Sequence, residues 1–217
     1  MKIAIVGGTG KEGSGLAVRW ARAGINVVIG SRDEHKAKQV SADLNRHHQG
    51  PAIIGMNNPA AARAAEQLVV LTVPYSAHKP TLGDIRDALA GKILVDVTVP
   101  LDPKNPKRVI MPSEGSAAEE AGMILGPEVK VVAALQNVSS GSLHLYDHPI
   151  HCDILVCGND PAAKQLTIAL MEKLGVRALD AGSAESARAV EAMTAVLIGL
   201  NIKYKLKHAG LKIWEGD

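Results

Sequence analysis

The sequence predicts an α/β protein built on a doubly wound parallel sheet. Segments with strand and helix character alternate along most of the 217 residues, and this alternation is typical of a parallel sheet with helices on both faces. The apolar run at residues 2–6 leads into a glycine-rich turn and then into apolar residues at helical spacing. After about residue 140 the pattern changes, so we expect a domain at residues 1–140 and a small α/β-to-helical domain at residues 141–217.

The first strand, turn and helix have the pattern of a dinucleotide site. Residues 7–13 read GGTGKEG between a strand and a helix, and this context makes a glycine motif informative. Gly8 would permit the tight turn, Gly10 would let the backbone approach a pyrophosphate, and Gly13 would let the helix pack closely on the strand. The start of the helix would then bind the phosphates, unless the glycines mark only a turn. The predicted contacts are Gly8, Thr9, Gly10, Lys11, Glu12 and Gly13.

The second predicted strand, at residues 26–30, ends in side chains that suit a phosphate. Proteins that bind the non-phosphorylated cofactor place an acidic residue there, on the ribose 2′-hydroxyl. Here that place holds Ser31 and Arg32, and Lys36 follows one helical turn later. A guanidinium and an ammonium group suit the 2′-phosphate of NADP(H). Asp33 comes after Arg32 and is expected to start the second helix, where its charge favours the positive helix end. The alternative is that these basic residues are only the solvated start of a helix.

The remaining elements follow from apolar runs, capping residues and prolines. Strands are predicted at residues 51–56, 68–73, 93–97, 129–135, 154–158 and 176–179. Helices are predicted after Asn57 or Asn58, from Thr81 or Asp84 to Leu89, at 116–122, and after Asn159 or Asp160 with Pro161 in the first position. Residues 102–112 hold prolines and charges and are expected to form a loop. Residues 186–211 are strongly helical and apolar on more than one face, which favours a subunit interface over deep burial.

The carboxyl ends of the predicted strands form the expected ligand site, because ligands of open α/β sheets lie there. The segments that follow the strands at 68–73, 93–97 and 129–135 should therefore surround the nicotinamide and the group with which it reacts. The cofactor contacts predicted there are Thr72, Val73, Pro74, Tyr75, Val99, Pro100 and Ala134.

The composition excludes several classes of protein. A net charge of +2 with 47% hydrophobic residues gives no sign of nucleic-acid or anionic-membrane binding. With no Phe, two Trp and three Tyr, the chain has little material for stacking on bases. No apolar run reaches the roughly 18 residues of a membrane span, and a strand that starts at residue 2 leaves no room for a signal peptide. Cys152 and Cys157 make no disulfide framework, so we expect a cytoplasmic protein.

The sequence shows no obvious set of catalytic acids and bases. It has neither a Ser-His-Asp order nor a tyrosine and lysine pair at helical spacing. Hydride transfer between two bound rings needs proximity and orientation rather than such residues, so we predict no catalytic side chain. His144, His148, His151 and Cys152 could bind a metal ion together with Asp147 and Asp153. Their spacing matches no standard ligand pattern, so we favour a surface loop and predict no metal site.

Several motifs spread over nearly the whole chain are similar to those of one enzyme family. They are Gly7-Gly8-Thr9-Gly10-x-x-Gly13, Gly30-Ser31-Arg32 with Lys36, Ile54-Gly55-Met56, Val70-Leu71-Thr72-Val73-Pro74, Ser116-Ala117-Ala118-Glu119, Val156-Cys157-Gly158, Leu179-Asp180-Ala181-Gly182 and Arg188-x-Val190-Glu191. The chain resembles the F420:NADP oxidoreductases in these motifs. The resemblance implies a Rossmann domain with a small C-terminal domain, usually dimeric, and reversible hydride transfer between NADPH and the deazaflavin coenzyme F420.

The resemblance also implies roles for particular residues. Thr9, Ser31, Arg32 and Lys36 would bind the 2′-phosphate. F420 would lie over the nicotinamide near the residues Gln136, Asn137, Val138, Ala209, Gly210 and Leu211. A homodimer would form through the C-terminal helices.

The departures from the family pattern fall around the electron acceptor. The loop at residues 136–139 reads Gln-Asn-Val-Ser in place of His-Thr-Ile-Pro, and Tyr75 replaces a tryptophan. The alternatives are therefore an NADPH-dependent reductase of a flavin, or of ferric ion through a flavin, and a non-catalytic NADP-sensing protein.

Overall fold

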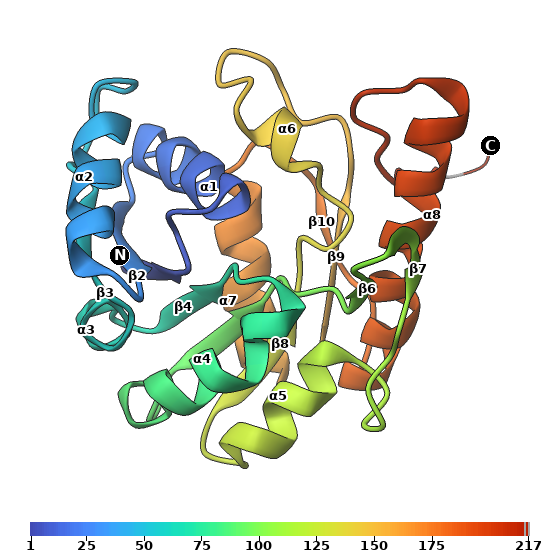
Figure 1. Ribbon diagram of the computed structural model, residues 1–217, viewed down its shortest axis with the longest axis horizontal. Coiled ribbons are helices and arrows are strands. Elements are labelled where there is room, and N and C mark those ends of the chain that lie inside the picture. Colours follow the sequence, from blue (N-terminus) through green and yellow to red (C-terminus); the bar gives the residue numbers. More distant parts are fainter. Residues whose placement is uncertain (215, 217) are drawn as a thin grey trace.

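The structure is a computed structural model that describes residues 1–214 and residue 216. Within this part of the chain the main sheet has eight strands in the order β10-β9-β8-β5-β4-β1-β2-β3. All neighbours from β8 to β3 are parallel. Helices pack on both faces of the sheet (Figure 1), which confirms the predicted α/β fold.

The elements of the sheet and their helices have the following bounds. The strands of the main sheet are β1 (Lys2–Val6), β2 (Asn26–Ser31), β3 (Ile54–Asn57), β4 (Leu68–Leu71), β5 (Ile93–Asp96), β8 (Lys130–Ala133), β9 (Ile154–Gly158) and β10 (Ala178–Asp180). The α-helices are α1 (Lys11–Arg22), α2 (Glu34–Leu44), α3 (Asn58–Ala64), α4 (His78–Ile85), α5 (Ala117–Leu125), α6 (Ser140–Leu143), α7 (Pro161–Glu172) and α8 (Ala187–Tyr204). Short 3₁₀ turns are η1 (Tyr75–Ala77), η2 (Arg86–Ala88) and η3 (Ala184–Ser186).

β1 shows how the sheet divides the core into two layers, because successive side chains of a strand point to opposite faces. Ile3 and Ile5 pack in the cluster that includes α1 and α7, whereas Ala4 and Val6 pack in the cluster that includes α3, α4 and α5. Trp20 of α1 is fully buried, and its Nε1 donates to the backbone oxygen of Leu170 on α7 at 3.0 Å. The first and seventh helices are therefore joined directly on one face.

The strand order places the expected ligand crevice at the carboxyl ends of β1 and β4. The chain builds outward from β1 through β2 to β3, then crosses back to β4 and continues through β5 to β8. A crevice forms at the carboxyl ends of the strands where this direction reverses. β1 and β4 lie side by side at this point, with Val6 in register with Leu71.

β9 and β10 extend the same sheet beyond β8, and both strands run antiparallel to the other six. β9 is antiparallel to β8, with Ala133 in register with Cys157, and β10 is parallel to β9. The parallel arrangement therefore does not extend over the whole sheet. The domain division near residue 140 stays a prediction.

Three capping predictions are confirmed. The side chains of Asp33, Asn57 and Asp160 accept hydrogen bonds from backbone N–H groups at the starts of α2, α3 and α7. Each carboxylate or amide oxygen satisfies a donor that the first helical turn leaves free. The carboxylate of Asp33 thus caps the start of α2, as the sequence predicted.

Three predicted elements were wrong in extent or type. Residues 102–112 do not form a plain loop, because β6 (Leu101–Asp102) and β7 (Asn105–Val109) pair as a hairpin that packs beside α8. Prolines are tolerated in such an edge strand. Helix α8 ends at Tyr204 rather than near residue 211, because Lys205 adopts a left-handed conformation with φ 55°. The helix expected from residue 81 or 84 begins earlier, at His78.

Candidate active site

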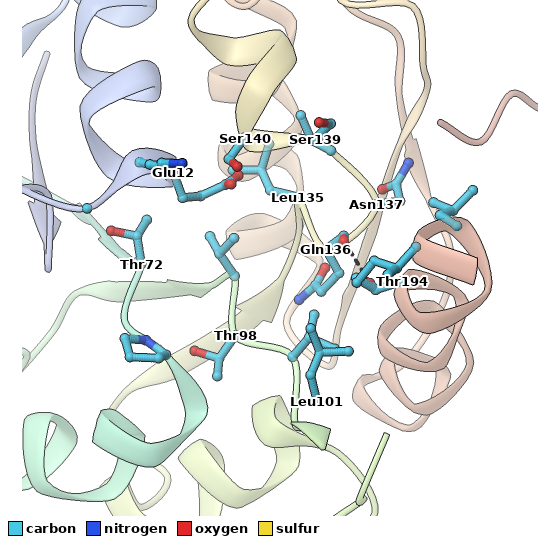
Figure 2. A pocket seen from close by; sticks show the side chains of 18 of the residues that line it. Glu12, Thr72, Thr98, Leu101, Leu135, Gln136, Asn137, Ser139, Ser140 and Thr194 are labelled. Atoms are coloured by element: carbon cyan, nitrogen blue, oxygen red, sulfur yellow. Dashed lines mark hydrogen bonds between the residues drawn. The ribbon is translucent and has the colours of Figure 1, made fainter. Parts of the chain in front are cut away.

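A pocket of about 500 Å³ lies at the carboxyl ends of the central strands (Figure 2). It is closed on one side by the glycine turn and the start of α1, and on the other by α8. The predicted site residues that line it are Gly10, Lys11, Glu12, Thr72, Val73, Pro74, Tyr75, Val99, Gln136, Asn137, Val138 and Ala209. The structure therefore brings residues predicted for the cofactor and for the acceptor into one cavity.

The other predicted site residues lie outside this lining. They are Gly8, Thr9, Gly13, Ser31, Arg32, Lys36, Pro100, Ala134, Gly210 and Leu211. Gly210 lines a neighbouring cavity of about 210 Å³, which shares Asn137, Ser139 and Ala209 with the first one. The backbone oxygen of Leu211 accepts a hydrogen bond from the backbone N–H of Asp153 at 2.8 Å.

Sequence reasoning missed several residues that line the pocket. They are Leu101, Leu135, Ser140, Thr194, Leu197, Ile198 and Asn201. Four of these belong to α8, whose apolar faces were interpreted as a subunit interface. Thr194 is held toward the pocket because its Oγ1 donates to the backbone oxygen of Gln136 at 2.7 Å (Figure 2). These four residues reach the pocket because α8 packs against the carboxyl ends of the strands. No local pattern in the sequence predicts that packing.

The glycines of the first turn divide their roles differently from the prediction. The left-handed residue is Gly7, with φ +75°, and not Gly8. A Cβ at Gly8 would lie 2.8 Å from the Cβ of Ile29 on β2, so Gly8 is required by close packing. A Cβ at Gly13 would lie 2.6 Å from the Oγ1 of Thr72, which confirms the predicted close approach of helix and sheet.

Gly10 and the start of α1 form an uncapped helix end at the pocket. A Cβ at Gly10 would meet only the backbone oxygen of Gly7, at 3.5 Å, so the protein's own packing does not require glycine here. Gly10 is also the N-cap of α1, and it offers no side chain to the free N–H groups of the first turn. Those donors and the positive helix end are suited to an anion.

The end of β2 presents basic side chains to solvent. Ser31 is buried, and its Oγ accepts a hydrogen bond from the backbone N–H of Asp33 at 3.2 Å. Arg32 and Lys36 are exposed. The carboxylate of Asp33 is engaged by the backbone N–H of Lys36 at 3.2 Å. The carboxylate of Asp33 is therefore engaged by its own helix, and among the described residues Arg32 and Lys36 form no ion pair.

Four oxygen atoms among the pocket residues are buried without a hydrogen-bond partner in the described part of the chain. They are Oε1 of Glu12, Oγ1 of Thr98, Oε1 of Gln136 and Oδ1 of Asn137. The amide nitrogens of Gln136 and Asn137 donate to the backbone oxygens of Asp96 and Asp153, at 2.8 and 2.7 Å. Because a backbone oxygen only accepts, these contacts fix the amides with their oxygens free.

Unpartnered buried acceptors indicate a site built for a ligand that donates hydrogen bonds. A nicotinamide carboxamide and the N–H of a pyrimidine-type ring are donors of this kind. Burial raises the pKa of the Glu12 carboxyl to about 8. At neutral pH this side chain therefore adds little negative charge beside a pyrophosphate.

Tyr75 connects the pocket to a buried polar cluster that the sequence did not reveal. Its hydroxyl donates to Oε1 of Glu120 on α5 at 3.0 Å, and Glu120 is 1% exposed. Beyond it lie His78 and Asp96, both fully buried. This cluster joins Tyr75 and His78, which are close in the sequence, to Asp96 on β5 and Glu120 on α5, which lie 18 and 42 residues beyond His78.

The segment at residues 144–153 does not assemble a metal site. Among the described residues no three His, Cys, Asp or Glu side chains are grouped so that they could hold a metal ion. His144 contacts the backbone oxygen of Lys11 at 2.8 Å, and Cys152 is buried with the pKa of its thiol raised to about 11 by that burial. Asp153 instead pairs with Arg177.

The strand order, the glycine turn and the cavity at the carboxyl ends define a dinucleotide-binding oxidoreductase of the Rossmann class. No helix in the described residues is both long and apolar enough to cross a membrane. Residues 2–100 match the family model described as "NADP oxidoreductase coenzyme F420-dependent".

Known proteins agree with this class and narrow it. The chain is 43% identical to the F420-dependent NADP reductase of Methanocaldococcus jannaschii, over 98% of each chain. It is 42% identical to the F420-dependent NADP reductase of Methanothermobacter thermautotrophicus, over 98% of this chain and 94% of the relative. A crystal structure of a proposed F420-dependent NADP reductase from Arthrobacter sp. FB24 superposes with a TM-score of 0.85 at 29% identity, covering 99% of this chain and 100% of the other. This chain therefore belongs to the family of F420-dependent NADP reductases.

Proposed function

We propose that this protein transfers a hydride reversibly between NADPH and coenzyme F420. The observation that carries the proposal is the single pocket that joins the uncapped start of α1 to the free amide oxygens of Gln136 and Asn137. One end suits the phosphates of a dinucleotide, and the other suits ring N–H donors. Two rings held in one cavity meet the proximity that hydride transfer requires.

The 2′-phosphate of NADP(H) is assigned to the end of β2. Arg32 and Lys36 lie on the exposed surface, while the carboxylate of the adjacent Asp33 caps α2. A guanidinium and an ammonium group bind a phosphate with charge-assisted hydrogen bonds. Ser31 and Thr9 would add hydroxyl groups to the same site.

The acceptor ring is assigned to the side of the pocket that faces α8. Leu101, Leu135 and Leu197 provide aliphatic walls there, and Val138 and Ala209 also line the pocket. Flat apolar walls with a few fixed polar groups are typical of sites for ring cofactors. Gly210 and Leu211 follow Ala209 and would border the same ring.

We further propose that two copies of the chain associate through α8 and the segment that follows it. Apolar side chains on this surface are unusually exposed, with Ile202 and Tyr204 at 59%, Leu206 at 50% and Trp214 at 83%. A surface of this kind is typical of a contact between subunits. The cytoplasmic location stays a prediction from the sequence.

The function is tested by mixing the purified protein with NADPH and F420 and following the deazaflavin absorbance. We expect loss of the oxidised deazaflavin band at a rate that saturates with both substrates. Turnover of a free flavin without turnover of F420 would favour the flavin reductase instead. Tight binding of NADPH without turnover of either acceptor would favour a sensor protein.

A further inference from the structure

One carboxylate oxygen of Glu120 connects the pocket with solvent. Its Oε1 lies 3.0 Å from the hydroxyl of Tyr75, which lines the pocket, and 3.1 Å from Nζ of Lys79. The side chain of Lys79 is 64% exposed, whereas that of Glu120 is 1% exposed. A surface ammonium group and a phenol at the pocket therefore bind the same buried atom.

The second oxygen of Glu120 leads to two further buried ionisable groups. Oε2 lies 3.0 Å from Nδ1 of His78, and Nε2 of His78 lies 2.7 Å from Oδ2 of Asp96. The other oxygen of Asp96 accepts from the backbone N–H of Thr98 at 2.9 Å, and Thr98 also lines the pocket. The cluster thus reaches the pocket at both ends.

Such a cluster is costly to bury. Removing charged groups from water carries a penalty that a well-packed apolar core avoids, so a buried set of this kind is weak evidence for a role in stability. Titratable groups with perturbed pKa values next to a ligand cavity are instead typical of functional sites.

The charges around the cluster keep protons available to it. Burial lowers the pKa of His78, but the charges and hydrogen bonds of Asp96 and Glu120 outweigh this, so the pKa is raised overall. Burial and then Glu120 raise the pKa of the Tyr75 phenol to about 12, so the phenol keeps its proton. Among the described residues, the other ionisable groups that face the cluster are Lys79 from α4, Glu191 from α8 and Glu114 before α5.

We propose that Glu120 passes protons between Lys79 at the surface and Tyr75 at the pocket, with His78 and Asp96 fixing its orientation. The proposal rests on the proposed function, because reduction of a deazaflavin takes up one proton in addition to the hydride. In that direction the O–H bond of Tyr75 breaks as an N–H bond forms on the acceptor. Lys79 gives a proton to the Glu120 carboxylate, Glu120 passes a proton to the phenolate oxygen, and water then restores the proton of Lys79. The hydride carries both electrons, so no group of the chain is oxidised or reduced.

The test follows hydride and proton separately in one rapid-mixing experiment. The full chain is mixed with NADPH and F420 in weakly buffered solution that contains a pH-indicator dye. In the wild type we expect proton uptake to keep pace with the deazaflavin change. In Lys79→Gln we expect proton uptake to slow at least fivefold and to recover when a small primary amine is added. In Tyr75→Phe we expect hydride transfer at least tenfold slower, with less than a twofold change in the dissociation constant of NADPH.

Two control variants separate the relay from general effects of substitution. Lys130→Gln removes an exposed lysine that does not line the pocket, and Tyr146→Phe removes a hydroxyl that contacts His144. Both should keep wild-type hydride and proton rates. If Lys79→Gln and Tyr75→Phe behave like these controls, the relay is overturned and the cluster has only a structural role.

An NMR titration of His78 tests the cluster without any acceptor. The His78 resonances should titrate above the ordinary pH range of histidine in the wild type and at lower pH in Glu120→Gln. An unchanged titration in that variant would overturn the link between the two residues. A wild type that transfers no hydride to F420 would instead overturn the proposed function, and the titration would still decide on the cluster.

Discussion

Nε of Arg19 on α1 donates a hydrogen bond to the backbone oxygen of Leu143 on α6 at 2.9 Å. Its Nη2 reaches three further backbone oxygens, those of Ser142, Leu145 and His148, at 2.9, 2.7 and 3.0 Å. A single buried guanidinium thus holds residues 142–148, which follow the pocket residues Gln136 to Ser140, against α1, the helix that starts at the proposed phosphate site. The two halves of the site are joined through this side chain.

Replacing Arg19 by lysine should destabilise the protein strongly. A lysine cannot span the four carbonyls, and hydrogen bonds from a charged donor contribute about 1.5–3 kcal/mol each. We expect the free energy of unfolding, measured in urea, to fall by roughly 3–5 kcal/mol. Arg22→Lys is the matched control, because Arg22 forms an exposed ion pair with Asp147 and should change the value by less than about 1 kcal/mol. Equal effects of the two substitutions would contradict this interpretation.

Arg19 also shows why part of the site could not be predicted from sequence. Leu16 and Trp20 follow helical periodicity, and an arginine between them is normally interpreted as solvent-facing. Its partners are backbone oxygens 123 to 129 residues away, which carry no side-chain signal. By contrast, the caps at Asp33 and Asp160 depend on neighbouring residues, so local rules were sufficient for them.

The same distinction applies to the pocket. The edge formed by Thr72, Tyr75 and Gln136 was predictable, because every parallel strand delivers its next residues to that edge. The wall from Thr194 and the cluster of His78 with Glu120 depend on how α8 and α5 pack. The positions of these residues are set by tertiary packing, and their spacing along the chain does not predict them.

Replacing Arg32 by alanine should weaken binding of NADPH far more than that of NADH. The guanidinium is exposed and would bind the 2′-phosphate that only NADPH carries. Loss of a charge-assisted bond should cost about 1.5–3 kcal/mol for NADPH. Titration calorimetry with both dinucleotides measures the difference. Arg46→Ala, an exposed arginine past the end of α2 that pairs with Asp43, should affect neither, and equal losses for both dinucleotides with Arg32→Ala would refute the phosphate assignment.

A charge on the exposed face of α8 should prevent association of the chain with itself. Ile202 is 59% exposed, and burying a glutamate there without a partner would oppose the proposed contact. We expect Ile202→Glu to sediment as a monomer at micromolar concentration while the wild type sediments as a dimer. Met123→Glu changes an even more exposed apolar residue, at 76% on α5, and should leave the dimer intact. A monomeric wild type would disprove the interface.

Glu12 should make the stability of the protein fall as the pH rises. Burial raises the pKa of its carboxyl from 4.5 to about 8, so the folded chain holds a proton that the unfolded chain has already released. Stability is therefore lost between about pH 4.5 and 8, and the loss levels off above that range. Glu12→Gln keeps the neutral shape at every pH, so relative to the wild type it should gain roughly 2–4 kcal/mol between pH 5 and pH 9. Urea unfolding at both pH values measures this gain. Glu172→Gln changes an exposed glutamate on α7 and should follow the wild type. A difference between Glu12→Gln and wild type that does not change with pH would show that this carboxyl is solvated in the folded protein.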